Sequence, residues 1–267
     1  MYPILLSIAG FHLTSFSVFI ILSWCVFSFV FWKSLLEEGV SEDRIFDLMF
    51  YATLVSIVVA RMGFVLTHWD QFAGAILRTV ALWVAPGLSL YAGVGSALGA
   101  MAMLSKRYKV RIGAVLDAFG LALPGALIVG SVGSLLDGAE IGKVARLFWA
   151  IRYVGLPEFR HPYQLYAILS LVIIFIIVGF LWERRQTMKL AMGAVGIGFF
   201  LLWAPSIFVL EYFKDNHIYW YNLSINQWMA LVLFSLAFGV WYVYSGGKFI
   251  VGRIVRSIYG RIPKRHS

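Results

Sequence analysis

The chain has little charge and a single cysteine, and both scarcities restrict what it can be. Charged residues make up 13% of its 267 residues and hydrophobic residues 61%, whereas an ordinary soluble domain is about 25% charged. A soluble globular enzyme is therefore excluded and a membrane protein is expected. Cys25 has no second cysteine to pair with, so helix packing and not an internal disulfide must hold the fold.

Two other features are missing from the sequence. Residues 1–13 contain no Lys or Arg, and no small-residue cleavage site is evident. A cleaved signal peptide normally has both, so we expect the first apolar run to be a membrane span. Ligand spacing for a metal is also lacking, because the five histidines are scattered; they are His12, His68, His161, His217 and His266. We therefore predict no metal and no cofactor.

Long apolar runs are abundant. A helix needs about 20 apolar residues to cross a hydrocarbon core of about 30 Å, and runs this long exclude the alternating strands of a membrane barrel. Seven candidate spans are residues 14–32, 45–67, 86–104, 114–136, 163–182, 191–213 and 226–245. The sequence thus predicts an all-α polytopic membrane bundle of about seven transmembrane helices over residues 1–245, followed by a basic tail over 246–267.

Basic residues are distributed unequally between the two sides of these spans. Fifteen of the 22 Lys and Arg residues fall in the tail and in the loops after spans 1, 3 and 5, six fall on the other side, and Arg61 lies within span 2. By the positive-inside rule the N-terminus is outside and the C-terminus is cytoplasmic. Orientation also explains the net charge of +9 better than a nucleic-acid partner does, and the tail favours anionic lipid headgroups.

Charged side chains inside or beside spans are candidates for function because they are costly in lipid. Arg61 is flanked by apolar residues and could clamp a phosphate or form an interior ion pair; a snorkelling or purely packing role is the alternative. Glu211, near the end of span 6, is a counter-ion, a proton acceptor or an ordinary interface carboxylate. Asp117, in the first turn of span 4, is expected to cap that helix.

The longest loop, residues 137–162, is on the predicted outer side and is long enough to form a small functional cap. It runs into Arg160-His161-Pro162-Tyr163-Gln164-Leu165-Tyr166, where Pro162 favours a helix start. His161 is a candidate for proton transfer or phosphate contact, with a plain interface position as the alternative.

These residues carry a family resemblance. Arg160 to Tyr166 matches the R-H-P-x-Q-L-Y signature of the bacterial prolipoprotein diacylglyceryl transferase family, although Ala167 replaces the closing glutamate. Further anchors occur in family order: Phe11-His12 resembles L-H-W-Y, Ala60-Arg61-Met62-Gly63-Phe64-Val65 resembles [GA]-R-[LI]-G-Y-V, Asp117 with Pro124 resembles D-x6-P, and Val209-Leu210-Glu211-Tyr212-Phe213 resembles V-E-F-F. The chain as a whole resembles this family of seven-span enzymes.

Several family positions differ in this chain. Ser131 stands where the family has its phospholipid-binding arginine, and Ile207 stands at the second essential arginine. Tyr91 replaces a histidine, Thr14 replaces a tyrosine, Ser134 and Asp137 replace asparagines, and the acidic residue that follows is displaced to Glu140.

The resemblance implies a reaction and its partners. A diacylglyceryl group would move from the phospholipid phosphatidylglycerol to the lipobox cysteine of a precursor protein in the bacterial inner membrane, and glycerol phosphate would be released. It implies catalytic roles for His161, Glu140 and Tyr91, and substrate contacts by Arg61, His12, Ser131, Ser134, Asp137, Arg160, Gln164, Tyr166 and Glu211. Such chemistry needs help in forming a thiolate and positive charge near the leaving phosphate. Basic loop residues such as Arg146, Arg152 and Arg160 could join Arg61 there.

Two other hypotheses remain open. A relative that binds phospholipid or lipoprotein precursors without turnover would account for the replaced arginines. A small-solute transporter has weaker support, because the sequence shows no paired inverted halves.

Overall fold

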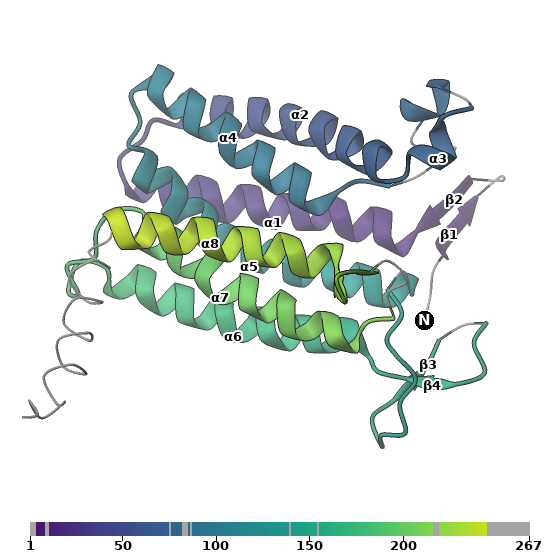
Figure 1. Ribbon diagram of the computed structural model, residues 1–267. Coiled ribbons are helices and arrows are strands. Elements are labelled where there is room, and N and C mark those ends of the chain that lie inside the picture. The colour runs from purple at the N-terminus through teal and green to yellow at the C-terminus, as the bar shows by residue number, and fades with distance from the viewer. Residues whose placement is uncertain are drawn as a thin grey trace, which may run out of the picture. The chain divides into compact units, whose positions relative to one another are not determined.

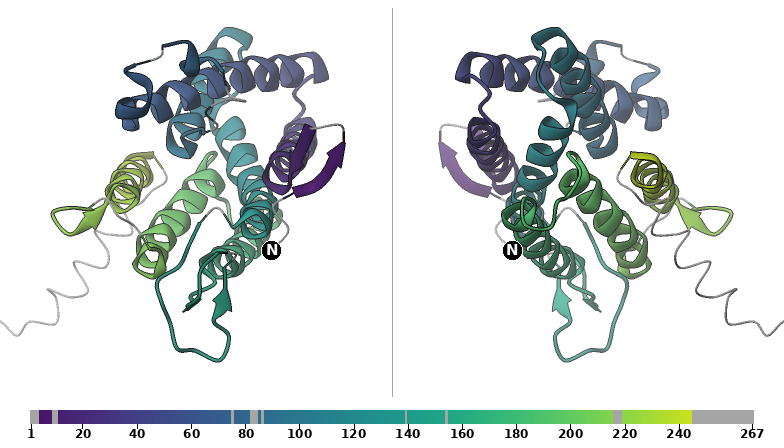
Figure 2. Two further views of the ribbon diagram at one scale, coloured as in Figure 1. Left: turned by 90° about the vertical axis from the view of Figure 1, so that its right-hand side faces the viewer. Right: turned by 90° about the vertical axis from the view of Figure 1, so that its left-hand side faces the viewer.

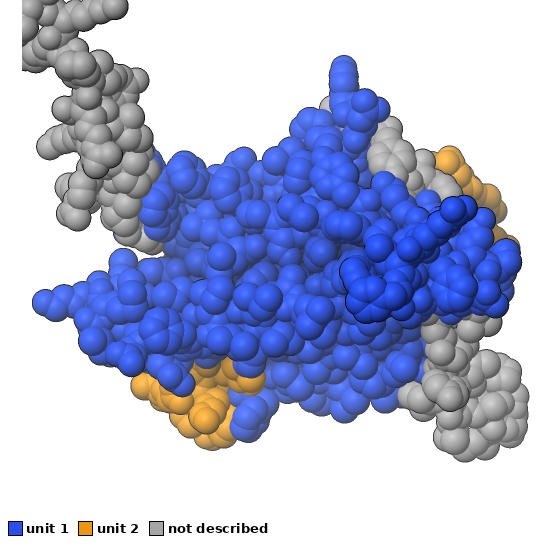
Figure 3. Space-filling view, turned by 90° about the horizontal axis from the view of Figure 1, so that it is seen from below, with its two compact units in different colours: residues 1–29, 117–267 blue, residues 30–116 orange. Residues whose placement is uncertain are grey.

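The computed structural model describes residues 4–8, 11–74, 76–81, 85, 87–138, 140–153, 155–215 and 219–244, with the backbone alone at 4–8, 11–13, 76, 219 and 220. The predicted basic tail, residues 246–267, lies outside these ranges. The chain divides into two compact units, residues 1–29 with 117–267 (unit 1) and residues 30–116 (unit 2), which Figure 3 shows in two colours.

Long helices dominate both units (Figure 1). Within the described residues six of them are long and apolar enough to cross a membrane. They are α1 (Ser15–Glu37), α2 (Glu42–Thr67), α5 (Ile112–Asp137), α6 (Tyr163–Arg184), α7 (Ala194–Leu210) with the short η2 (Glu211–Phe213) that continues it, and α8 (Ile225–Tyr244). The predicted all-α polytopic membrane bundle is confirmed.

The predicted third span is the exception among the seven. It forms α4 (Leu90–Tyr108), a 19-residue helix that lies four residues further along than the predicted range 86–104. Lys106 and Arg107 occupy its last turn, and their charge lowers the hydropathy of the helix. For that reason α4 is a helix where one was predicted but is not among the six.

Unit 2 contains α4 packed against α2, with the short helices α3 (Trp69–Phe72) and η1 (Ile76–Thr79) between them in the sequence. Small residues allow the close approach: a Cβ on Gly63 would lie 2.7 Å from that of Ala92. The Ser56 hydroxyl donates to the Gly93 carbonyl oxygen at 3.0 Å. This is the pattern of membrane helices that pack through small residues and interhelical hydrogen bonds.

In unit 1, α6, α7 and α8 lie side by side (Figures 1 and 2), and α5 crosses α7 where Gly120 meets Gly196. A Cβ on Gly120 would lie only 2.4 Å from the Gly196 Cα. Asp117, 5% exposed, accepts hydrogen bonds from the backbone N–H groups of Gly193 at 2.8 Å and Gly196 at 2.9 Å. The expectation that it caps its own helix is therefore wrong: its carboxylate caps α7, whose N-terminal N–H groups have no intrahelical partner.

The described part of the chain also contains three short antiparallel hairpins that were not predicted. They are β1 (Ile4–Ile8) with β2 (Phe11–Thr14), β3 (Ile151–Arg152) with β4 (Phe159–Arg160), and β5 (Tyr219–Trp220) with β6 (Leu223–Ser224). Each lies at a helix end, and strands of two to five residues are too short to show a hydrophobic period of two.

Candidate active site

The loop between α5 and α6 folds back on the end of α7 and forms a cap, defined here as residues 140–162 together with 211–215 of unit 1. Backbone pairing joins three of its segments: Lys143 N–H donates to the Phe213 carbonyl and His161 N–H to the Lys143 carbonyl, both at 2.9 Å. Asp215 N–H donates to the Ile141 carbonyl, also at 2.9 Å. The cap lies at the end of the bundle where α5 ends and α6 begins (Figure 1).

His161 is the central titratable side chain of this cap. Its Nδ1 lies 3.2 Å from the hydroxyl oxygen of Tyr166, and the indole N–H of Trp149 donates to the same oxygen at 2.6 Å. The Phe213 ring packs edge-on against the imidazole, with ring centroids 5.2 Å apart. The imidazole is half-buried, so it is oriented by its neighbours and still reachable by a substrate. Imidazole is also the side chain that exchanges protons near neutral pH.

Gln164 connects the start of α6 to the cap. It is 1% exposed, its amide nitrogen donates to the Glu140 carbonyl oxygen, and its Oε1 accepts from the Tyr153 hydroxyl at 2.9 Å. Burial raises the pKa of the Tyr153 phenol above its usual value, which keeps the hydroxyl protonated as a donor. The Gln164 of the signature thus fixes the cap onto the helix.

Two basic side chains of the cap are held by carboxylates. Lys214 Nζ lies 2.6 Å from Glu140 Oε1, and Arg160 Nη1 lies 2.7 Å from Asp215 Oδ2. Arg160 Nη2 also meets Glu158 at 3.2 Å. Predicted site residues Glu140, Arg160, His161, Gln164 and Tyr166 are therefore brought together in one small region, joined by Lys214 and Asp215.

Glu211 lies where α7 passes into η2 and is 4% exposed. Its Oε1 accepts from the Ser224 hydroxyl at 3.0 Å and from the Asn226 amide at 2.7 Å. Gln227 completes this cluster, because its Oε1 accepts from the Ser224 N–H at 2.9 Å and its amide donates to the Phe208 carbonyl at 3.2 Å. A buried carboxylate held by neutral donors joins the end of α7 to the start of α8.

The remaining predicted site residues lie elsewhere. Ser131, Ser134 and Asp137 occupy the last two turns of α5, and within the described residues no hydrogen bond or ion pair links them to the His161 cluster. Tyr91 is in the first turn of α4, in unit 2. His12 lies in β2, where the backbone alone is described, paired in register with Ser7.

Arg61 belongs to unit 2 and is 7% exposed. Its guanidinium donates to four backbone carbonyl oxygens, of Thr79 and Arg78 at 2.7 Å, Ala85 at 2.8 Å and Gly87 at 3.0 Å. The Phe72 ring centroid lies 5.2 Å from its Cζ. The guanidinium thus binds backbone carbonyls of η1 and of Ala85 and Gly87; its predicted contact with phosphate stays a prediction.

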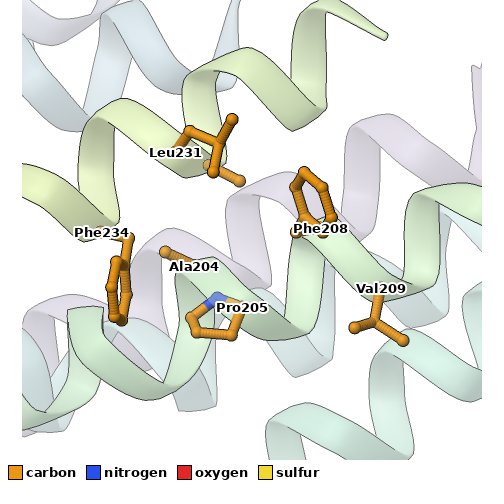
Figure 4. A pocket seen from close by; sticks show the side chains of 7 residues that line it. Ala204, Pro205, Phe208, Val209, Leu231 and Phe234 are labelled. Carbon is orange, nitrogen blue, oxygen red and sulfur yellow. The ribbon is translucent and has the colours of Figure 1, made fainter. Parts of the chain in front are cut away.

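An apolar groove of about 280 Å³ runs between α7 and α8 in unit 1. Figure 4 shows the side chains that line it, which come from Ala204, Pro205, Phe208 and Val209 on α7 and from Ala230, Leu231 and Phe234 on α8. Every lining residue is apolar, and both helices are candidate membrane spans, so the groove is suited to a hydrocarbon chain.

Sequence reasoning missed several residues of these clusters. Trp149, Tyr153, Asp215, Ser224 and Asn226 contact predicted site residues directly. The available signal was weak: each is a polar or amphipathic residue in a loop or, like Asn226, at the end of a span, where ordinary interface residues also occur.

Fold and site together define a class, namely a multi-pass helical membrane protein with a cap at one end of its helices that carries a histidine within a polar cluster. Comparison with known proteins gives the family: the model for prolipoprotein diacylglyceryl transferase matches residues 3–243, and the chain belongs to that family. A phosphatidylglycerol–prolipoprotein diacylglyceryl transferase of Aeromonas hydrophila subsp. hydrophila is 28% identical over 217 residues, covering 78% of this chain and 77% of the relative. Proteins of the same name from Dechloromonas aromatica and Wolbachia pipientis are 30% and 24% identical, covering 72% and 88% of this chain and 74% and 91% of the relatives.

Proposed function

We propose that the protein transfers the diacylglyceryl group of phosphatidylglycerol to the cysteine thiol of a lipobox in a precursor protein. The observation that carries this proposal is the family match over residues 3–243, which spans every cluster described above. The cysteine sulfur attacks the carbon of the diacylated glycerol that bears the phosphate. A C–S bond forms as that C–O bond breaks, and the headgroup leaves as glycerol phosphate with the bonding electrons.

The cap supplies groups suited to this reaction. The thiol proton must be removed, and His161, oriented by Tyr166 at 3.2 Å, is the candidate acceptor. The leaving phosphate needs positive charge, and Lys143 and Arg146 of the cap are exposed while Arg160 and Lys214 are already paired with carboxylates. Preorganised charge of this kind typically lowers a barrier by several kcal/mol when it meets the transition state.

The groove between α7 and α8 is the proposed place for an acyl chain of the lipid substrate. Two features support it: its lining is wholly apolar, and Phe208 lies three residues before Glu211, so one end of the groove approaches the cap. Phosphatidylglycerol would then keep its hydrocarbon in the membrane while its headgroup reaches the polar cluster.

We also propose that the protein resides in the bacterial inner membrane with its N-terminus outside and its C-terminus in the cytoplasm. The asymmetry of Lys and Arg supports this orientation. It places the cap on the outer side, where an exported precursor with a lipobox is presented.

The test is transfer of labelled diacylglyceryl from phosphatidylglycerol to a lipobox peptide by the purified protein, together with rescue of cells that lack the authentic enzyme. We expect labelled diacylglyceryl on the peptide thiol, and we expect the rescued cells to grow. A binding protein without turnover, the alternative motivated by Ser131 and Ile207, predicts that lipid copurifies with the protein while label and growth are both absent.

A further inference from the structure

One segment of the cap exposes an unusual amount of apolar surface. In the aromatic loop, defined as residues 144–150, Phe148 is 95% exposed, Val144 54% and Trp149 45%. Phe159, on β4 beside it, is 52% exposed. Clustered apolar surface of this kind marks a site of contact with a protein or a membrane.

Hydrogen bonds and ring contacts hold the aromatic loop in a defined conformation. The Ala145 N–H donates to the Phe159 carbonyl at 2.9 Å, and the Ala150 N–H to the Leu147 carbonyl at 3.1 Å. The Phe148 and Trp149 rings meet edge to face at 4.3 Å, and the Trp149 indole is anchored on Tyr166 at 2.6 Å. A hollow of about 580 Å³ is lined by the rest of the loop, including Val144, Arg146 and Phe148, and by Glu158 and Phe159.

Positive charge surrounds the exposed rings. Lys143, Arg146 and Arg152 are exposed, and the Arg152 guanidinium lies 4.8 Å from the Phe159 ring centroid. Glu158, which also borders the hollow, is paired with Arg160 at 3.2 Å. The surface is therefore aromatic and basic, which is the composition of segments that rest on anionic bilayers.

The direction of the aromatic loop also fits a bilayer surface as its partner. It begins seven residues after α5 ends at Asp137 and precedes α6, which begins at Tyr163. In Figure 1 the loop that leads into β3 hangs to the side, transverse to α6, while the connection from β3 to β4 continues along the helix direction. Since α5 and α6 are candidate membrane spans, a transverse loop at their ends lies parallel to the bilayer surface.

We propose that the aromatic loop lies in the interface of the surrounding anionic bilayer, with Phe148 and Trp149 at the boundary of headgroups and acyl chains and with Arg146 and Arg152 on lipid phosphates. This anchoring does not require catalysis. It would hold the cap at a fixed height over the membrane.

Spin labels on single cysteines test this placement in the full chain. In a Cys25→Ser background, Phe148→Cys reports on the aromatic loop, and Pro157→Cys, exposed in the connection from β3 to β4, is the matched control. The labelled proteins are placed in vesicles of phosphatidylethanolamine with phosphatidylglycerol, or of phosphatidylcholine alone. Collision rates of each label with oxygen, which concentrates in lipid, and with a water-soluble nickel complex are then compared.

We expect the label at 148 to favour oxygen and the label at 157 to favour nickel in the anionic vesicles. The label at 148 should shift toward water in phosphatidylcholine, and also in anionic vesicles when Arg146→Gln and Arg152→Gln are combined. Water exposure at 148 in anionic vesicles overturns the proposal, as does a depth that is the same in both lipids. Immobilisation of a water-exposed label only on addition of a lipobox peptide would assign the loop to the precursor protein instead.

Discussion

His161 and Tyr166 share a hydrogen bond whose geometry limits how the imidazole can act. The Trp149 indole can only donate, so the Tyr166 oxygen accepts from it at 2.6 Å. A single proton then bridges the Tyr166 oxygen and His161 Nδ1, which are 3.2 Å apart. This bridge orients the ring. When the bridging proton belongs to Nδ1, the opposite nitrogen, Nε2, carries no hydrogen and is the one that can accept a proton.

If His161 accepts the thiol proton, His161→Ala should lower the rate of diacylglyceryl transfer by about 100-fold or more, the usual contribution of a general base. Tyr166→Phe should lower it less, since the imidazole remains but loses its orienting partner. The measurement is the initial rate of lipobox peptide labelling. His68→Ala is the control, because His68 lies in unit 2 and stacks on Phe64. A wild-type rate in the His161→Ala variant would remove His161 from the mechanism.

Arg61 allows a second prediction, which separates two roles. Arg61→Lys keeps the charge but cannot donate to four carbonyl oxygens in a planar fork. Because the lost contacts are hydrogen bonds to the carbonyls of Arg78, Thr79, Ala85 and Gly87, we expect a destabilisation of about 2–4 kcal/mol, from loss of several charged hydrogen bonds. Thermal unfolding in detergent measures it. An unchanged melting temperature with a raised KM for phosphatidylglycerol would instead indicate direct phosphate binding.

The candidate site was predictable where a residue and its role lie in one short segment, as in Arg160 to Tyr166. Partners distant in sequence were not: nothing in the pattern around Arg61 indicates backbone carbonyls 17 to 26 residues away. Every residue type supplies a backbone carbonyl acceptor, so a sequence motif cannot identify which carbonyls will be bound. Asp117 shows the same limit, because its partners are 76 and 79 residues distant.

At the scale of elements, the contact between α5 and α7 depends on a carboxylate at a helix N-terminus. Gly193 has a φ of 89°, a conformation that favours glycine, and its N–H points at Asp117. Asp117→Asn would turn an amide N–H₂ group toward one of the two donors and remove the charge that favours the helix dipole.

We expect Asp117→Asn to destabilise the protein by about 1–3 kcal/mol, the cost of an unsatisfied buried polar group. Thermal unfolding followed by circular dichroism in detergent would measure the change. Asp137→Asn, at the C-terminal end of the same helix, is the matched control and should cost little, since a carboxylate there opposes the dipole. Equal melting temperatures for the two variants would contradict the capping role.

The groove between α7 and α8 gives an element-scale prediction about substrate. Leu231→Trp fills the groove, whereas Val232→Trp, at an exposed position next to it on α8 and outside the lining, does not. We expect Leu231→Trp to raise the KM for long-chain phosphatidylglycerol by about 10-fold, equal to losing burial of about two methylene groups. Phosphatidylglycerol with shorter acyl chains should restore the KM of the Leu231→Trp variant. Identical kinetics in both variants would mean that the acyl chains lie elsewhere.

At the scale of the whole molecule, hydropathy predicted the helical bundle well. Each spanning helix makes its backbone hydrogen bonds internally, so it needs only an apolar surface to be stable in lipid. The boundaries shifted where local chemistry intervened, as at Gly193, which delays the start of α7 to Ala194. The cap could not be predicted in this way. Its pairing depends on contacts between residues 141–145, 159–161 and 213–215, which are distant in sequence and adjoin the ends of α5, α6 and α7.

Orientation in the membrane is the remaining whole-molecule prediction. The cap itself carries Lys143, Arg146, Arg152, Arg160 and Lys214, which weakens the charge asymmetry within unit 1, but the full chain still has fifteen basic residues on one side against six on the other. Two of the five cap residues, Arg160 and Lys214, are moreover paired with carboxylates. The positive-inside rule therefore still predicts a cytoplasmic position for the connection between α6 and α7.

Single cysteines in a Cys25→Ser background can measure this orientation, with a membrane-impermeant maleimide applied to spheroplasts. Gln186→Cys, exposed between α6 and α7, should react only after the membrane is permeabilised, whereas Tyr221→Cys, exposed between β5 and β6, should react without permeabilisation. The two sites lie at opposite ends of unit 1, so each is the control for the other. The reverse pattern would put the cap in the cytoplasm, away from exported precursors, and a lipobox cysteine could not then reach His161.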